Sequence, residues 1–168
     1  MHRKLLFVVI STFLFLFIAC SKDEDENDYE VQPIPEYKGN ASGTYQAILR
    51  NKPIVLQEYM QVSEVFPFDL TVEGRFGGRI LKFKFPKASQ GSVQNFSGNY
   101  RTPTITFNFY NEGSNFLTID SNNLEKGILT ARFKVTGSGE DTTTNPPTIQ
   151  TVLLDSGYFN LSYPSFEP

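Results

Sequence analysis

From residue 68 onward, apolar and polar side chains alternate with a period of two, which is typical of β-strands that bury one face and expose the other. Four segments show this alternation clearly: residues 68–76, 81–85, 104–110 and 129–135. In the first, Phe68, Leu70 and Val72 form the apolar set, and Thr71 is one of the polar residues between them. Helical spacing fits none of the four, so the pattern predicts an all-β domain.

A glycine pair, Gly77-Gly78, separates the first two segments. Glycine accepts the positive φ angles of a tight primed turn, so the pair predicts a β-hairpin with a fixed register. Three facing pairs follow from that register: Leu70 with Phe85, Val72 with Phe83, and Glu73 with Lys82. The first two pairs put apolar residues on one face, and the third puts opposite charges on the other face.

Less regular alternation predicts further strands at residues 44–50, 54–59, 115–120 and 149–163. Asp155-Ser156-Gly157 interrupts the last of these, as a bulge within one strand or as a turn between two. Residues 137–147, rich in Gly, Thr and Pro, indicate a mobile loop. The sum is a single antiparallel domain of eight or nine strands, arranged as a sandwich or a flattened up-and-down barrel.

The N-terminus has the three parts of an export signal: basic residues at 2–4, an apolar core at 5–19, and then Cys20. A membrane-spanning helix needs about 20 apolar residues, so the shorter core favours a signal that is removed. The small residue Ala19 precedes the only cysteine of the chain. This arrangement predicts cleavage before Cys20 and lipid attachment to its thiol, with the acyl chains joining the protein to a membrane.

The residues after Cys20 are strongly acidic and resemble the surface-export signal of Bacteroidetes lipoproteins, in which a lysine and a run of acidic residues follow the lipidated cysteine. The matching residues are Ser21, Lys22, Asp23, Glu24, Asp25 and Glu26. The resemblance implies an outer-membrane lipoprotein that faces the cell exterior. A solvated tether that stays in the periplasm is the alternative, and in either location a block of like charges predicts disorder.

Charge and composition divide the chain into three parts: a signal peptide at residues 1–19, a lipidated cysteine with an acidic disordered tether at 20–39, and a β domain at 40–168. The β domain carries 11 acidic and 11 basic residues, so the chain's net charge of -3 arises in the N-terminal parts. A neutral, exported domain is a poor partner for nucleic acid.

The order of these parts also resembles a group of small, uncharacterised Bacteroidetes outer-membrane lipoproteins with an all-β domain of unknown function. Residues 127–136, with the sequence GILTARFKVT, and Gly157-Tyr158-Phe159 correspond to two short motifs of that group. The resemblance implies an exported, lipid-anchored β domain, and it carries no functional residues that can be transferred to this chain.

The composition argues against catalysis. His2 is the only histidine and is removed with the signal, and the thiol of Cys20 is taken by lipid. Ser/His and Cys/His catalysis, and metal sites built from imidazole or thiolate, therefore have no ligands in the mature domain. The sequence predicts a protein that is not an enzyme, with no catalytic residue, no metal and no cofactor.

Binding is the function class that remains. Exposed aromatic rings can contact glycans, and we expect the candidates among the tyrosines: Tyr59, Tyr100, Tyr110 and Tyr158. One hypothesis is a non-catalytic, surface-displayed interaction module, with a glycan or an outer-membrane protein as its partner. The alternative is a lipocalin-like carrier that holds a small apolar ligand inside a β-barrel.

Overall fold

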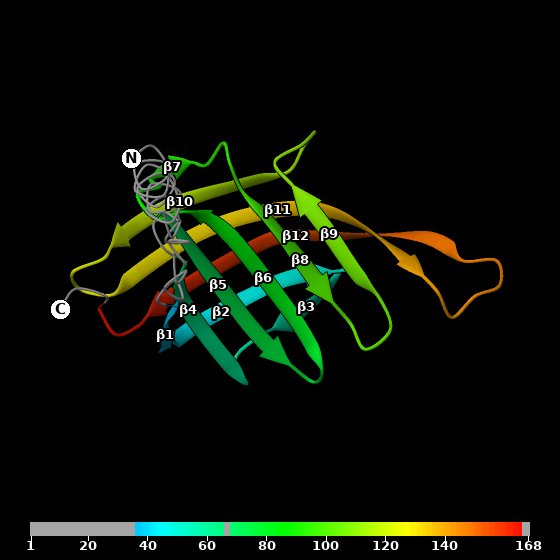
Figure 1. Cartoon of the computed structure of the whole chain (residues 1–168), viewed down its shortest axis with the longest axis horizontal. Helices are drawn as coiled ribbons and strands as arrows, with labels where there is room; N and C mark the ends of the chain where they lie inside the picture. The colour runs from blue at the N-terminus through cyan, green and yellow to red at the C-terminus, as the bar shows by residue number, and fades with distance from the viewer. Residues whose placement is uncertain (1–35, 66–67, 166–168) are drawn as a thin grey trace, which may run out of the picture. The chain divides into compact units, whose positions relative to one another are not determined.

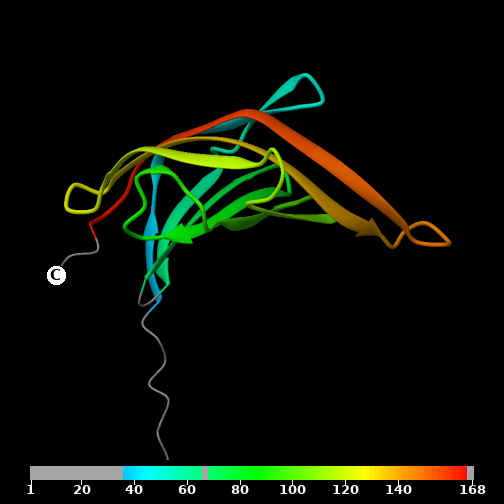
Figure 2. The same ribbon diagram turned by 90° about the horizontal axis from the view of Figure 1, so that it is seen from above.

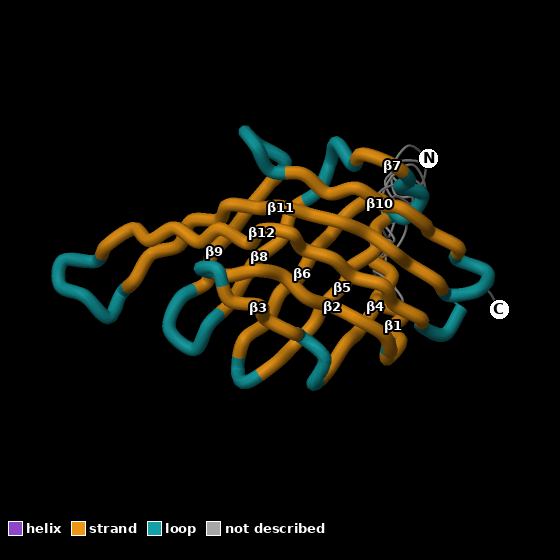
Figure 3. Tube along the Cα trace, turned by 180° about the vertical axis from the view of Figure 1, so that it is seen from behind, coloured by secondary structure: helices purple, strands orange, loops and turns teal. Residues whose placement is uncertain are grey.

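The computed structural model describes residues 36–65 and 68–165, and in these ranges the chain forms strands and loops without a helix (Figures 1 and 3). Twelve strands follow one another along the sequence. They are β1 (Glu36–Asn40), β2 (Ser42–Leu49), β3 (Lys52–Val55), β4 (Tyr59–Val65), β5 (Asp69–Phe76), β6 (Arg79–Pro86), β7 (Gly91–Ser92), β8 (Ser97–Arg101), β9 (Thr106–Tyr110), β10 (Phe116–Asn123), β11 (Ile128–Asp141) and β12 (Thr148–Ser162).

All of these strands belong to one sheet, and every pairing is antiparallel. The main path runs β1-β4-β5-β6-β8-β9-β11-β12-β2-β3, while β10 pairs with β11 on one side and with the short β7 on the other. β1 and β2 lie near opposite ends of this order, but only Ala41 separates them along the chain, so the backbone brings the two ends of the sheet together. The sheet therefore curls over its own interior, with β11 and β12 lying across the other strands (Figure 2). The all-β antiparallel prediction is confirmed.

The predicted hairpin is confirmed in its register. Gly77 and Gly78 have φ angles of 54° and 75°, as a primed turn requires. All three facing pairs form as predicted: Leu70 with Phe85, Val72 with Phe83, and Glu73 with Lys82. The ion pair of Glu73, however, is formed with Arg75, whose Nε donates to Glu73 Oε1 at 2.6 Å.

Two residues of the first alternating segment differ from the prediction in their exposure to solvent. Phe68 precedes β5 and is 74% exposed, because it lies outside the paired strand. Thr71 is only 6% exposed although it lies on the outward face. Its register partners are Ser63 on β4 and Lys84 on β6, so neighbouring strands flank it on both sides.

The strand map also differs from the sequence prediction. The structure has twelve strands rather than eight or nine. Residues 54–59 belong to two strands, since β3 ends at Val55 and β4 begins at Tyr59. β1 begins at Glu36, inside the range predicted as tether. Residues 137–141 extend β11, so the loop predicted at 137–147 is confined to residues 142–147, at the far end of a long β11–β12 arm (Figure 3).

The interruption in the last strand is a bulge. The register of β12 shifts against β2 between Asp155 and Tyr158, while β12 continues without a break from Thr148 to Ser162. Ser156 has a φ angle of 48°, and Ser156 N–H donates to the Asp155 carboxylate at 2.6 Å. Of the two alternatives, bulge or turn, the bulge is correct.

Aromatic side chains fill the space inside the curled sheet. The ring of Phe83 on β6 lies 4.6 Å from that of Phe133 on β11 and 5.0 Å from that of Phe109 on β9, measured between centroids. Tyr45 on β2 reaches across the interior, and its hydroxyl donates to the Leu81 carbonyl at 3.4 Å. A Cβ added at Gly74 would clash with the Tyr45 ring, so this glycine allows β5 to approach β2 closely. The interior between the strands is therefore packed.

Candidate functional site

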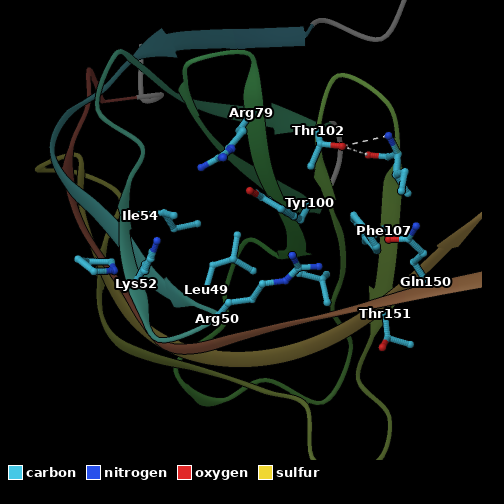
Figure 4. A pocket seen from close by; sticks show the side chains of 13 residues that line it. Leu49, Arg50, Lys52, Ile54, Arg79, Tyr100, Thr102, Phe107, Gln150 and Thr151 are labelled. Atoms are coloured by element: carbon cyan, nitrogen blue, oxygen red, sulfur yellow. Dashed lines mark hydrogen bonds between the residues drawn. The ribbon is translucent and has the colours of Figure 1, made fainter. Parts of the chain in front are cut away.

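A cavity of about 470 Å³ lies at one end of the curled sheet, at the root of the β11–β12 arm (Figure 4). Its walls come from the β2–β3 turn, the start of β6, the β8–β9 turn and the first part of β12. The volume falls in the range of about 300–1,000 Å³ that is usual for small-molecule sites, which often lie in the mouths of β-barrels. This cavity is the candidate functional site.

The β2–β3 turn forms one wall and carries two of its charges. Leu49 and Lys52 pair across the hairpin, and Arg50 and Asn51 form the two-residue turn between them. Their φ angles of 49° and 62° match a primed turn. Asparagine adopts such angles readily, but arginine does so only uncommonly. The turn places both Arg50 and Lys52 on the cavity.

The opposite wall is held by a tightly bonded turn between β8 and β9. Ile105 N–H donates to Thr102 Oγ1 at 3.0 Å, and the Thr102 hydroxyl donates to the Ile105 carbonyl at 3.1 Å (Figure 4). Just before and after this turn, Tyr100 and Phe107 face each other in register, and their rings stack with centroids 6.3 Å apart. The turn thus fixes an aromatic pair at the cavity wall.

The base of the cavity is apolar and buried. Five lining residues are at most 8% exposed to solvent: Ile54, Tyr100, Ile105, Phe107 and Val152. Beside Val152, Gln150 Nε2 donates to the buried Asp141 carboxylate at 2.7 Å, and that carboxylate also accepts from the N–H and the hydroxyl of Thr143. Hydrogen bonds thus join the β12 wall to the end of β11 and to the loop that follows it.

The rim of the cavity is cationic. Arg50, Lys52 and Arg79 are exposed and line the opening, and no carboxylate, imidazole or thiol lines it within the described ranges. In the same ranges these three cations form no ion pair, whereas five other basic residues do: Arg75, Lys84, Lys87, Arg132 and Lys134. Because like charges repel, the unpaired cluster favours an anion.

Tyr100 is the most unusual residue of the site. Its side chain is 1% exposed, and its hydroxyl has no hydrogen-bond partner in the described structure. The phenol points into the cavity from β8 (Figure 4). Leaving a buried hydroxyl unpaired costs about 1–3 kcal/mol. Burial raises the pKa of Tyr100 above its ordinary value of 10.0, while the charges of Arg79 and Arg50 act in the opposite direction. The neutral phenol is therefore available as a donor to a ligand.

The four tyrosines predicted as ligand contacts lie in different places, and only Tyr100 lines the cavity. Tyr59 begins β4, and the Arg75 guanidinium lies over its ring at 5.2 Å from the centroid. Tyr110 is 55% exposed and borders a separate hollow of about 210 Å³ on the outer face of β6, β8 and β9. Tyr158 is half-buried on β12, opposite Arg132. No common aromatic platform joins the four.

Other sequence predictions fall outside the described residues. The signal peptide at 1–19, the lipid-attachment residue Cys20 and the export signal Ser21, Lys22, Asp23, Glu24, Asp25 and Glu26 all belong to this group. Within residues 36–65 and 68–165, no group of three or more potential ligand residues could hold a metal ion. The same ranges contain no helix of the length and hydropathy needed to cross a membrane.

The sequence reasoning missed the cationic residues of the cavity. A signal was present, because Arg50 lies beside the turn at Asn51 and Arg79 directly follows Gly77-Gly78, so both arginines adjoin tight turns. Which turns lie at the same end depends on the curl of the sheet, which local periodicity does not encode.

In comparisons with known proteins, no family model, no curated protein and no solved structure matches the chain.

Proposed function

We propose that this chain is a lipid-anchored, non-catalytic binding module that is displayed on the cell surface and takes a small ligand in the cavity at the end of its sheet. The observation that carries the proposal is the Tyr100 phenol, a buried polar group without a partner that points into a cavity of ligand size. Buried polar groups are almost always hydrogen-bonded, so an unpaired one at a cavity marks a place where a ligand supplies the partner.

The lining supports binding rather than catalysis. Its polar groups are guanidinium, ammonium, hydroxyl and amide groups, which bind and orient a ligand. General acid–base chemistry near neutral pH commonly uses a carboxylate or an imidazole, and the described lining offers neither.

The anchor and the cell-surface location rest on the sequence: the apolar segment that ends at Cys20, and the acidic residues that follow it. A binding domain on such a tether would deliver its ligand to a partner in the same membrane. An outer-membrane protein, or a glycan held by one, is the partner that this location favours.

The carrier hypothesis, with a ligand enclosed among the strands, has less support. The rings of Phe83, Phe109 and Phe133 occupy the interior that such a ligand would need. The cavity lies beside this aromatic core, at the end of the sheet.

The proposal is tested by purifying the full-length chain from its host and identifying bound small molecules by mass spectrometry. Thr151 is exposed and lines the cavity, so Thr151→Trp should obstruct the site and remove the bound molecule. Gln46→Trp, at an exposed position of β2 away from the cavity, is the matched control and should retain it. Equal retention by both variants would place the ligand elsewhere and contradict the proposal.

A further inference from the structure

We infer that the ligand is a small organic anion, a carboxylate or phosphate group attached to an apolar body. The anionic group would be held by Arg50, Lys52, Arg79 and the Tyr100 hydroxyl, and the apolar body would rest on the base of the cavity. This inference depends on the proposed function, since it specifies the ligand of the same site.

The first argument is charge. Three cationic side chains surround one opening without a described carboxylate among them, whereas five of the eight other basic residues in the range 40–165 form ion pairs. Guanidinium groups bind carboxylate and phosphate with paired hydrogen bonds, and such charge-assisted bonds are about twice as strong as neutral ones. An anion would both relieve the repulsion among the cations and satisfy their donors.

The second argument comes from the backbone. Arg50 has a φ angle of 49°, in the left-handed region where a long side chain is uncommon. Glycine would form the same turn without that conformational cost, as Gly77 and Gly78 do between β5 and β6. A sparsely populated conformation at a ligand cavity is typical of functional positions, and here it places a guanidinium at the rim.

The third argument is the division of the cavity into a charged rim and an apolar base. The base is formed by Ile54, Ile105, Phe107 and Val152, all at most 8% exposed. An inorganic ion would bind at the rim and leave the apolar base unfilled. An organic anion fills both parts, since its apolar body displaces water from the base.

The cavity disfavours other ligand classes. A metal cation would be repelled by the rim. A neutral sugar usually stacks on an exposed aromatic ring, and the two aromatic residues of the lining, Tyr100 and Phe107, are 1% and 6% exposed. A neutral apolar ligand would leave the three cations without a counter-charge and the buried phenol without a hydrogen-bond partner.

The experiment compares 2-naphthoate with its neutral analogue 2-naphthamide and with inorganic phosphate. Binding to the full-length chain in lipid nanodiscs is measured by isothermal titration calorimetry, and the signal of empty nanodiscs is subtracted. We expect one molecule of 2-naphthoate per chain and an affinity at least about tenfold higher than that of either comparison compound, the ratio that corresponds to one charge-assisted hydrogen bond.

Two variants test the assigned groups. The triple variant Arg50→Gln, Lys52→Gln, Arg79→Gln should lose at least about tenfold in affinity for 2-naphthoate. Its charge-matched control, Lys82→Gln, Lys126→Gln, Lys134→Gln, removes three cations that do not line the cavity and should stay within about twofold. Tyr100→Phe keeps the ring and removes the hydroxyl, so it should weaken 2-naphthoate binding more than 2-naphthamide binding.

The outcomes separate this inference from the proposed function. If 2-naphthamide binds as tightly as 2-naphthoate and Thr151→Trp abolishes both, the cavity is a binding site but the anionic class is wrong. If inorganic phosphate binds as tightly as 2-naphthoate, the ligand needs no apolar body and that part of the inference is wrong. If the triple variant and its control bind alike, the assigned cations are wrong. If no probe binds and no host molecule co-purifies, the proposed function fails as well.

Discussion

At the scale of single residues, the same kind of side chain has different effects at different places. Tyr45 and Tyr100 are both fully buried, but the Tyr45 hydroxyl donates to a backbone carbonyl while the Tyr100 hydroxyl has no partner in the described structure. The first joins two parts of the sheet through a hydrogen bond. The second lowers stability until a ligand supplies an acceptor, which is the behaviour expected of a recognition group.

The core depends on one aromatic residue more than on the others. Phe83 is 0% exposed and its ring lies near those of four phenylalanines: Phe96, Phe109, Phe133 and Phe159. We expect Phe83→Ala to lower the free energy of unfolding by about 3–5 kcal/mol, because it opens a cavity among these rings. Phe68→Ala, at a position 74% exposed, is the control and should change it by less than about 0.5 kcal/mol. Chemical denaturation measures both, and similar losses would contradict the packing of Phe83 among these rings.

Buried tyrosines also predict how stability depends on pH. Burial is the largest cause of a raised pKa at Tyr45, Tyr100 and Tyr163, and at Tyr163 it raises the pKa to about 12. Between the ordinary pKa of 10.0 and these higher values, the unfolded chain releases protons that the folded chain keeps. The tyrosine contribution is therefore fully present below pH 10 and is lost as the pH rises through this window.

The measurement is a series of denaturant unfolding curves from pH 8 to pH 12, with tyrosine ionisation followed by absorbance. We expect the free energy of unfolding to fall above about pH 10 and ionisation to remain incomplete while the chain is folded. Full ionisation in a chain that keeps its fold would show that these hydroxyls are accessible.

At the scale of elements, the turns set the positions of the strands and of the site. A Cβ at Gly77 would meet no atom within 4 Å, and one at Gly78 would meet only Pro103 at 3.6 Å. The glycines are therefore required for their φ angles rather than for space. The β2–β3 turn uses the same backbone region with Arg50 and Asn51, which places a charge where the other turn has none.

We expect the double variant Gly77→Ala, Gly78→Ala to destabilise the domain by about 1–2 kcal/mol per residue, because alanine is strained at positive φ. Ser138→Ala, at an exposed position of β11, is a control without this conformational cost. Thermal melting compares the two. An unchanged melting temperature in the double variant would mean that the turn can relax to another geometry.

The elements show what local sequence can predict. The β5–β6 hairpin was predictable because its alternation, its glycine pair and its charges agree on one register. β8 was missed because Tyr100 is its only fully buried residue, and β1 was missed because it lies next to the acidic segment. The cavity was not predictable, since it joins residues from separate turns that only the curl of the sheet brings together.

At the scale of the whole molecule, the β domain is described by the structure, whereas its attachment to a membrane is predicted from the sequence alone. The described residues form a packed β domain with a cavity at one end. Attachment through Cys20, which lies outside those residues, is a prediction from the sequence.

Lipid attachment is tested by growing the host with labelled palmitate. We expect the wild-type chain to carry the label and Cys20→Ala to carry none, because the thiol is the predicted acceptor and no other cysteine is present. Ser21→Ala is the control and should remain labelled. An unlabelled wild-type chain would remove the basis for a lipid anchor.

Surface display is tested by adding protease to intact cells. Replacing the charged residues of the segment Lys22–Glu26 with Ser and Asn should protect the chain from cleavage, because the variant would remain in the periplasm. Neutralising Glu125 and Lys126, two exposed residues of the β10–β11 turn, is the control and should leave cleavage unchanged. Cleavage of both variants would show that the acidic segment is a spacer and not an export signal.

The position of β1 has a mechanical consequence for a protein held by its N-terminus. Tension on such an attachment enters the described domain at Glu36, the first residue of β1, which is paired along its length with β4. Beyond Ala41 the same backbone continues into β2, which is paired with β12. A pull that strips β1 from β4 would therefore next meet a second, separate set of hydrogen bonds. We expect the domain to yield to force in two steps, with β1 detaching first while β2 and the cavity beside it keep their structure.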